Sequence, residues 1–253
     1  DMYPKRKIRL WFLKQWQTRL SLKAKALWIP DESQQVDFPE SKLIWLPNIP
    51  LIDDRAKSQR RKVHDSHKGL TLLFVGYLAH KPNQVAVDKF LSLYWRSLHS
   101  EFKTIKFRIG GGGLPEYLRH NWRCYDDVEV CGRVEDLYGF YMSGDVVVAP
   151  MQIGSGTCIK VLEALSYGLP VVATPHGLRG IPTKDRVRSN SIYEFSDLES
   201  LKNILNQFLN ANHRRSINEQ GGCRYVKSKY TQQNINAIIG ESLTLSNNSK
   251  KSI

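Results

Sequence analysis

The chain has 253 residues, of which 41% are hydrophobic, and it carries a formal net charge of +13. This length and composition are enough for one large domain with a full core, and they exclude a disordered protein. Apolar stretches such as 145–151 and 169–173 are far shorter than the roughly 20 residues that a membrane-spanning helix needs. The excess of positive charge indicates an anionic partner without naming it.

No basic stretch followed by an apolar core and a small-residue cleavage site opens the chain, so we predict a cytoplasmic protein. The four cysteines form no C-x-x-C pair, which predicts reduced thiols and neither a zinc site nor a disulfide framework. They are Cys124, Cys131, Cys158 and Cys223.

Residues 7–26 have the apolar spacing of an amphipathic helix, with basic side chains interleaved. The segment 5–25 suits a peripheral contact with an anionic membrane surface, but it could equally be an outer helix of a further domain or a solvated surface. Apolar runs at 26–29 and 43–46, each stopped by proline, predict two strands. Residues 51–69 are polar and aperiodic, which is typical of a linker or surface loop.

From residue 70 onward strand and helix signals alternate. This alternation predicts an α/β fold, a Rossmann-like parallel sheet wound on both faces, with ligands at the carboxyl ends of the strands. The expected strands are 71–75, 105–109, 128–131, 145–149, 170–174 and 191–195, and the expected helices are 83–98, 114–121, 135–142, 157–167, 197–211, 213–228 and 231–243.

The most informative segment, 145–174, has the pattern strand, glycine loop, helix, glycine stop and strand. Gly154 and Gly156 allow a tight turn, while Ser155 and Thr157 can cap the helix and leave its first N–H groups pointing outward. A helix N-terminus carries about half a positive charge, so with Lys160 one turn inside it predicts a diphosphate site.

Glu163 lies three residues beyond Lys160 on the same helix face. A carboxylate there can accept hydrogen bonds from two adjacent hydroxyls, such as those of a ribose. The alternative interpretation is that Lys160 and Glu163 form a surface ion pair worth roughly 0.2–0.5 kcal/mol, and that the glycines only make a turn.

The run G-S-G-T-x-x-K-V-L-E-A-L-S-Y-G-L-P-V-V-A-T at 154–174 resembles the donor-site signature of the group 1 glycosyltransferases. Segments 74–83 and 130–137 resemble the first strand and loop and the base-pocket strand of the same C-terminal donor domain. The resemblance implies a GT-B fold, a nucleoside-diphosphate sugar donor, no obligatory metal or other cofactor, and transfer with retention of anomeric configuration.

Carried over by position, the resemblance gives roles to individual residues. Gly156 and Thr157 would meet the diphosphate through backbone N–H groups, and Gly76 would lie close to it. Val134 would touch the base through its backbone. Lys160 would neutralise the phosphates, and Glu163 would hold the ribose; we predict these two as the catalytic pair.

The sequence departs from the family pattern at three positions. The glutamate that contacts the donor sugar falls on Ser155, eight residues before Glu163, and the usual Arg after the first-strand glycine is Tyr77. The usual Lys falls on Pro82, with Lys81 one position early, so Lys81 joins Lys160 as a candidate for phosphate binding. Arg179, after another strand end, could also reach a phosphate or the sugar, or could lie in a plain loop.

The resemblance also divides the chain. Residues 1–50 resemble only the end of an acceptor-binding N-terminal domain, 51–69 a linker and 70–245 the donor domain, followed by a disordered tail at 246–253. The acceptor would be a glycan or a lipid-linked molecule, as in polysaccharide biosynthesis, and this chain alone would supply the donor site.

Other features carry less information. Glycines 110–113 could approach a ligand but more readily form a turn closed by Pro115. The histidines show no metal-ligand spacing, and no nucleic-acid-binding motif accompanies the basic residues. The second interpretation of the whole chain is a non-catalytic nucleotide-binding or interaction module, which the loss of the sugar-contacting glutamate at Ser155 favours.

Overall fold

The structure is a computed structural model that describes residues 12–13, 15–16, 18–21, 24, 26–30, 43–50, 55, 69–188, 190–210 and 219–248. Its centre is a parallel six-stranded sheet with the order β5-β4-β3-β6-β7-β8. The strands are β3 (Leu70–Val75), β4 (Ile105–Gly110), β5 (Val128–Gly132), β6 (Val146–Ala149), β7 (Val171–Ala173) and β8 (Ile192–Glu194). The predicted doubly wound sheet is therefore confirmed.

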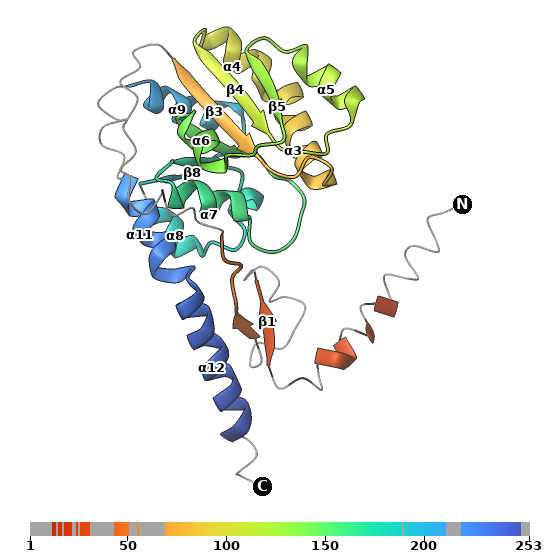
Figure 1. Cartoon of the computed structure of the whole chain (residues 1–253), viewed down its shortest axis with the longest axis vertical. Helices are drawn as coiled ribbons and strands as arrows, with labels where there is room; N and C mark the ends of the chain where they lie inside the picture. The colour runs from red at the N-terminus through yellow and green to blue at the C-terminus, as the bar shows by residue number, and fades with distance from the viewer. Residues whose placement is uncertain are drawn as a thin grey trace.

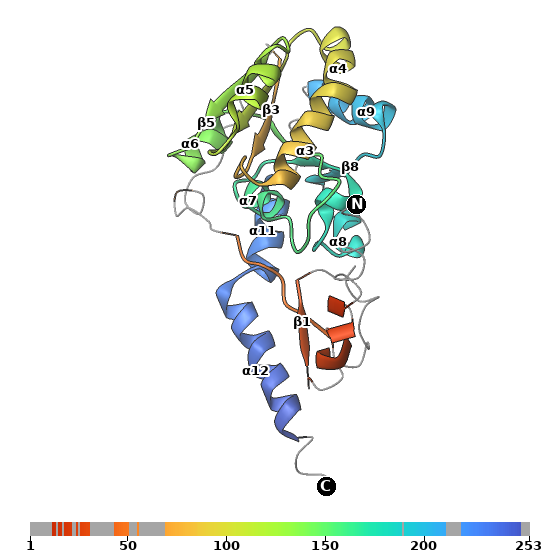
Figure 2. The ribbon, with the colours of Figure 1, turned by 90° about the vertical axis from the view of Figure 1, so that its right-hand side faces the viewer.

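Helices lie on both sides of this sheet (Figures 1 and 2). They are α3 (Lys81–Phe90), η3 (Leu91–Trp95), α4 (Arg96–Glu101), α5 (Glu116–Arg123), α6 (Leu137–Met142), α7 (Ile159–Ser166), η4 (Pro175–Leu178), α8 (Thr183–Arg188), α9 (Leu198–Leu209), α11 (Glu219–Lys229) and α12 (Gln232–Asn248). The helix expected at 83–98 is a continuous run from α3 to α4 with the π-helical turn η3 in its middle.

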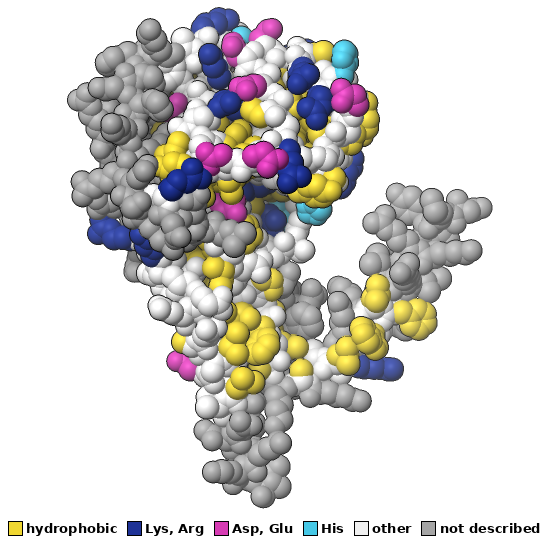
Figure 3. Space-filling model, viewed as in Figure 1, with side chains coloured by type: hydrophobic (Ala, Val, Ile, Leu, Met, Phe, Trp, Pro, Cys, Tyr) yellow, Lys and Arg dark blue, Asp and Glu magenta, His cyan; other side chains and the backbone are white. Residues whose placement is uncertain are grey.

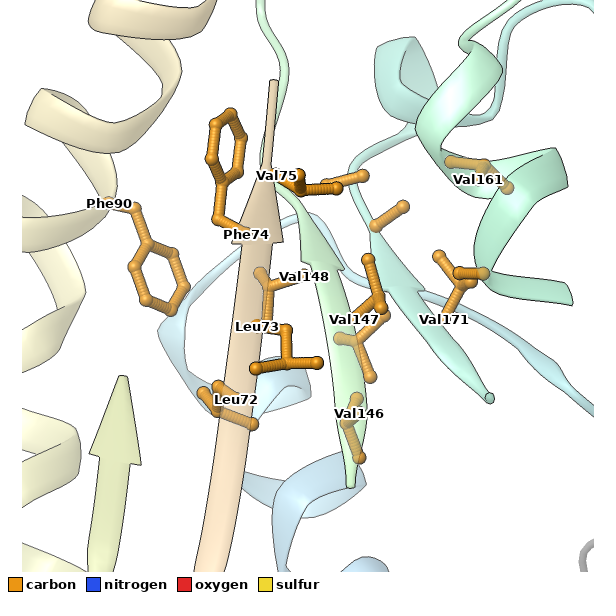
Figure 4. Close-up of a cluster of buried hydrophobic side chains, with 14 of the residues drawn as sticks. Leu72, Leu73, Phe74, Val75, Phe90, Val146, Val147, Val148, Val161 and Val171 are labelled. Carbon is orange, nitrogen blue, oxygen red and sulfur yellow. The ribbon is translucent and has the colours of Figure 1, made fainter. Parts of the chain in front are cut away.

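The central strands are buried because their sequences are apolar at nearly every position, as a strand covered on both faces requires. Leu72, Leu73 and Phe74 of β3 and all four residues of β6 are buried. Figure 4 shows the β3 side chains beside Val146, Val147 and Val148 of β6, with Phe90 of α3 and Val161 of α7 nearby. This core fixes the strand ends from which the loops of the site emerge.

Chain direction across the sheet reverses between its two middle strands. From β3 the chain moves outward to β4 and β5, then returns to β6 on the other side of β3 and continues to β7 and β8. A ligand crevice forms at such a switch point, outside the carboxyl ends of the strands. The loops after β3 and β6 therefore mark the place to look for a site.

The glycine turn at 110–113 packs directly on the loop after β3. The Gly76 N–H donates to the Gly110 carbonyl at 3.1 Å, and the Leu78 N–H donates to the Gly112 carbonyl at 2.8 Å. Gly111 has φ +150°, and a Cβ there would lie 1.8 Å from the Gly76 oxygen. The turn interpretation is thus confirmed, and its glycines permit a close approach of two backbones.

The N-terminal strands β1 (Leu27–Ile29) and β2 (Leu43–Trp45) pair in parallel outside the main sheet, and α12 runs beside them (Figures 1 and 2). Trp28 Nε1 donates to Ser242 Oγ of α12 at 3.2 Å. The Trp45 ring meets Tyr230, between α11 and α12, edge-on at 5.9 Å. Both predicted strands are confirmed, and the two ends of the described chain pack together.

The described residues between 12 and 21 are helical, as predicted, but their apolar side chains face outward. Phe12, Leu13, Trp16 and Leu20 are 45–61% exposed, and Figure 3 shows apolar side chains gathered over this part of the molecule and beside α12. Most of the basic segment 5–25 lies outside the described residues. Within the described part of the chain, no helix combines the length and apolarity that crossing a membrane requires.

One predicted boundary shifts. α12 extends to Asn248, so the first residues of the tail expected at 246–253 are helical, and 249–253 lie outside the described residues. Most of the linker expected at 51–69 also lies outside them. Arg55 is described: it forms an ion pair with Asp136 at 2.6 Å and lies 4.5 Å from the centre of the Tyr138 ring.

Candidate functional site

A cavity of about 250 Å³ lies at the switch point, between the carboxyl end of β3 and the N-terminus of α7. Residues from three separate segments of the sequence, 75–83, 151–163 and Arg179, meet there, which is the arrangement expected of a ligand site in this kind of sheet. The lining residues are Val75, Gly76, His80, Pro82, Asn83, Met151, Thr157, Cys158, Ile159, Lys160, Glu163 and Arg179.

The loop before α7 depends on its glycines, as predicted. Gly154 has φ +132° and Gly156 has φ +67°, a region that L-residues with side chains rarely adopt. The predicted helix cap is wrong, however. α7 begins at Ile159, two residues later than predicted, and its N-cap Cys158 makes no side-chain capping bond in the described structure.

Thr157 is turned away from the helix by tertiary contacts. Its hydroxyl donates to the Pro30 carbonyl at 2.8 Å and accepts the Asn48 N–H at 3.4 Å. Thr157 therefore joins the cavity wall to the N-terminal strands. The first N–H of α7, on Ile159, finds no acceptor among the described residues, so it remains available to an anion.

Lys160 is buried at the cavity wall, with 8% of its surface exposed. Its Nζ lies 2.7 Å from Asn83 Oδ1, 3.7 Å from Met151 Sδ and 4.0 Å from the centre of the Phe74 ring. All three partners are neutral. Burial, the largest effect, lowers the pKa of Lys160 from 10.5 to about 8. The surface ion pair weighed as the alternative is wrong, because Lys160 is buried and bonded elsewhere.

Glu163 also lines the cavity and is held by an aromatic hydroxyl. Tyr141 donates to Glu163 Oε2 at 3.0 Å, and the fully buried Tyr141 ring stacks on Tyr167 at 4.7 Å. Burial raises the pKa of Glu163, while the Tyr141 hydrogen bond and nearby Lys160 oppose that rise. One carboxylate oxygen is thus fixed by Tyr141, and the other can face a ligand.

Arg179 supplies a second cation to the cavity. One of its terminal nitrogens, Nη1, donates to the His176 carbonyl at 3.0 Å, whereas its buried Nε has no partner in the described residues. The other terminal nitrogen approaches Gly154 closely: a Cβ at position 154 would lie 2.9 Å from it. Gly154 therefore makes room for the guanidinium as well as for the turn.

The structure brings together Gly76, Thr157, Lys160, Glu163 and Arg179 from the predicted site. The other predicted residues lie outside the cavity wall. Lys81 is exposed at the start of α3, and Gly154 and Ser155 are exposed in the loop. Gly156 packs near Pro30 and Asn48, and Val134 packs against Gly110. Their contacts with a donor stay predictions.

The sequence analysis missed two polar partners that shape the site, Asn83 and Tyr141. Asn83 is the last residue of the segment 74–83, which resembles the family's first strand and loop, so this motif could have identified it as a site residue. Tyr141 carried no signal, because nothing local connects it to Glu163. Among the described residues, no three His, Cys, Asp or Glu side chains gather as metal ligands would.

These features define a Rossmann-like domain with a cavity at its switch point that Lys160 and Arg179 line. A family profile described as "Glycosyl transferases group 1" matches residues 69–210, more than half of the chain. The chain belongs to this family of glycosyltransferases.

The chain is also similar to individual proteins. An uncharacterised 44.6 kDa protein in the cps region of Klebsiella pneumoniae is 28% identical over 151 residues, which cover 57% of this chain and 38% of the relative. The crystal structure of TarM matches with a TM-score of 0.68 at 15% identity, over 90% of this chain and 44% of TarM. An S. aureus TarM variant has been crystallised with Fondaparinux, alpha-GlcNAc-glycerol and UDP.

HepE from Anabaena, in complex with UDP and glucose, matches with a TM-score of 0.61 at 15% identity, over 87% of this chain and 63% of HepE. These structural matches show the GT-B type of fold. The chain spans less than half the length of both the Klebsiella relative and TarM.

Proposed function

We propose that this chain provides the donor-binding half of a retaining glycosyltransferase, which moves a sugar from a nucleoside-diphosphate sugar to a glycan or lipid-linked acceptor. The observation that carries the proposal is the cavity at the switch point, where Lys160 and Arg179 supply two cations and Glu163 a single carboxylate. Such a set favours a ligand that offers both negative charge and hydroxyl groups.

In this proposal the diphosphate lies against Lys160, Arg179 and the first turn of α7. Charge-assisted hydrogen bonds to the two cations, with the free N–H of Ile159, stabilise the negative charge that develops on the departing diphosphate. Because the cations already supply positive charge, the scheme uses no metal ion. Catalysis is electrostatic, and no protein nucleophile takes part.

Glu163 accepts hydrogen bonds from the ribose hydroxyls through the oxygen that Tyr141 leaves available. Tyr141 stays protonated and donating at neutral pH, because burial raises its pKa well above the usual range. The sugar itself has no assigned contact, since Ser155 stands where the family places a glutamate. UDP accompanies both the S. aureus TarM variant and Anabaena HepE, so it is the first nucleotide to test.

The proposal places the protein in the cytoplasm, at the inner face of an anionic membrane. Its support is the basic segment 5–25 together with the exposed Phe12 and Trp16. Flotation with vesicles containing 30% phosphatidylserine should recover the chain, and Trp16→Ser should reduce that recovery. Equal recovery with neutral vesicles would argue against an electrostatic contact.

Calorimetric titration with UDP, GDP and ADP tests the donor site. We expect one nucleotide to bind, and Lys160→Ala and Glu163→Ala each to weaken that binding strongly. The matched control is Lys103→Ala, because Lys103 is exposed at the other end of the sheet, before β4. Failure of all three nucleotides to bind would favour the non-catalytic interaction module instead.

A further inference from the structure

We propose that Asn83 is a positioning residue of the donor site. Its side-chain amide holds the Lys160 ammonium at the cavity wall, where no carboxylate of the described residues bonds to it, and thereby sets the pH range in which the site accepts a diphosphate. This inference rests on the proposed function only for the identity of the ligand. The arrangement of Asn83 and Lys160 is independent of it.

The Asn83 amide is fixed in one orientation. Asn83 lies in the first turn of α3 with 8% of its surface exposed, and its Nδ2 donates to the Tyr77 carbonyl at 2.9 Å. Because that NH2 group meets an acceptor, the amide oxygen must face the other way. There it accepts from Lys160 Nζ at 2.7 Å. The sequence around Asn83 thus supplies a neutral oxygen at a buried cation.

The other groups around Lys160 leave this oxygen as its polar anchor. Met151 Sδ and the Phe74 ring are weak, neutral partners. The titratable groups that share the cavity are Cys158 and Glu163 of α7, Arg179 after η4 and His80 before α3. In the described structure, neither carboxylate nor thiol makes a hydrogen bond to Nζ.

Burial of Lys160 gives the arrangement its pH dependence. Desolvation, the largest effect, and the charge of Arg179 lower the pKa of Lys160, whereas Cys158 and Glu163 raise it, and together they leave it at about 8. The ammonium is therefore charged at pH 7 but loses its proton not far above it. A hydrogen bond from Nζ to the Asn83 oxygen favours the charged form. An oxygen with a formal charge would favour it more, but would also compete with the phosphates.

Gly76 provides the space for this pair beside the end of β3. A Cβ at position 76 would lie 2.9 Å from Asn83 Nδ2 and 3.2 Å from Lys160 Nζ. Any larger residue would displace one of the two groups. The bare backbone at Gly76 is thus part of the same arrangement.

Two substitutions should move the titration of Lys160 in opposite directions. Asn83→Leu removes the acceptor, so the Lys160 midpoint should fall by about one pH unit or more, the effect of a lost hydrogen bond to a charged group. Asn83→Asp places a carboxylate at the ammonium, so the midpoint should rise by at least about one pH unit. A purely structural role of Asn83 predicts neither shift.

Gln84→Leu is the matched control. Gln84 is the next residue of α3, is 7% exposed, and donates its amide to the Leu78 carbonyl at 2.8 Å, in the same loop that Asn83 holds. It has no contact with Lys160. Both Gln84→Leu and Asn83→Leu lose a contact to this loop, so both should lower the melting temperature similarly. Only Asn83→Leu should also shift the titration midpoint of Lys160.

The experiment is an NMR titration of the full chain carrying 13C-labelled lysine, with the Lys160 signal identified by its absence from Lys160→Met. It is paired with calorimetry against UDP, GDP and ADP from pH 6.5 to 9. Wild-type affinity should fall by up to about tenfold per pH unit above pH 8, because binding then takes up a proton. With a midpoint near 7, Asn83→Leu should lose about fivefold in affinity at pH 8 from titration alone, and less at pH 6.5.

Asn83→Asp should bind nucleotide at least about tenfold more weakly than the wild type at pH 7, although its Lys160 is more fully charged. Opposite shifts of the midpoint in the two variants support the inference. An unchanged midpoint in Asn83→Leu overturns it, and that variant decides the question if Asn83→Asp fails to fold. Shifted midpoints in a chain that binds no nucleotide would keep the role of Asn83 and refute the proposed function instead.

Discussion

Replacing Lys160 by Met should stabilise the protein while it weakens donor binding at least about tenfold. Lys160 is charged at pH 7, although burial lowers its pKa from 10.5 to about 8. At 1.36 kcal/mol per pKa unit, this difference means that the charged side chain costs about 3.4 kcal/mol in the folded state relative to the unfolded chain. Met has a similar length and a thioether that suits the neighbouring Met151 and Phe74.

The gain is smaller than that cost, because Asn83 Oδ1 loses its donor. An unsatisfied buried acceptor costs about 1–3 kcal/mol, so we expect a net stabilisation of about 0.4–2.4 kcal/mol at pH 7. For a chain of this size that raises Tm by about 2–4 °C per kcal/mol. Nucleotide affinity should fall at least about tenfold, since the main phosphate contact is removed.

Urea unfolding of wild type and Lys160→Met at pH 7 and pH 9.5 measures the effect. Between pH 8 and 10.5 the unfolded chain keeps the Lys160 proton and the folded chain does not, so wild-type stability gains as pH rises through this window. The difference between the two proteins should therefore shrink at pH 9.5. Lys103→Met, at an exposed position, is the control. A variant that is less stable at pH 7, or a difference independent of pH, would refute the reasoning.

Further predictions address the rest of the site and its support. In calorimetry, Glu163→Ala should weaken nucleotide binding by about 1–3 kcal/mol and Tyr141→Phe by about 0.5–1.5 kcal/mol. Circular dichroism should show that both variants are folded. An unfolded Glu163→Ala would instead mean that Glu163 has a structural role. Gly111→Ala should lower the free energy of unfolding by at least about 2–3 kcal/mol in urea, because its Cβ would meet backbone at 1.8 Å. Gly112→Ala is the control and should be tolerated, because the nearest atom to a Cβ there would be 3.7 Å away. Equal effects of the two substitutions would contradict this reasoning. Thr157→Val should cost about 1 kcal/mol and speed hydrogen exchange at 26–30 and 43–50, and unchanged exchange there would show that the hydroxyl contacts contribute little.

The sheet could be predicted because its signal is local. Each central strand is a short apolar run bounded by glycine, proline or charge, and the expected strands at 71–75 and 145–149 match β3 and β6 within one residue. The start of α7 could not be predicted in the same way. Thr157 has the chemistry of a helix cap, but a tertiary bond to Pro30 uses its hydroxyl instead.

The sequence predicts which charged residues line the site, but not the groups that surround and bond them. Spacing places Lys160 and Glu163 on one helix face, and both line the cavity. It also suggests an exposed pair, whereas the fold buries Lys160 against Asn83, 77 residues away, and ties Glu163 to Tyr141, 22 residues away. Such partners depend on the folding of distant segments, which no local pattern contains.

The contacts of Thr157 couple the cavity to the N-terminal strands. Thr157 lines the cavity, and its hydroxyl bonds backbone groups that follow β1 and β2. Of these strands, β1 also bonds α12, from Trp28 to Ser242. A ligand that orders the first turn of α7 must therefore also order the β1–β2 pair, and a displacement of that pair must disturb the wall where the diphosphate is proposed to lie. Donor binding and the position of these strands should thus depend on each other.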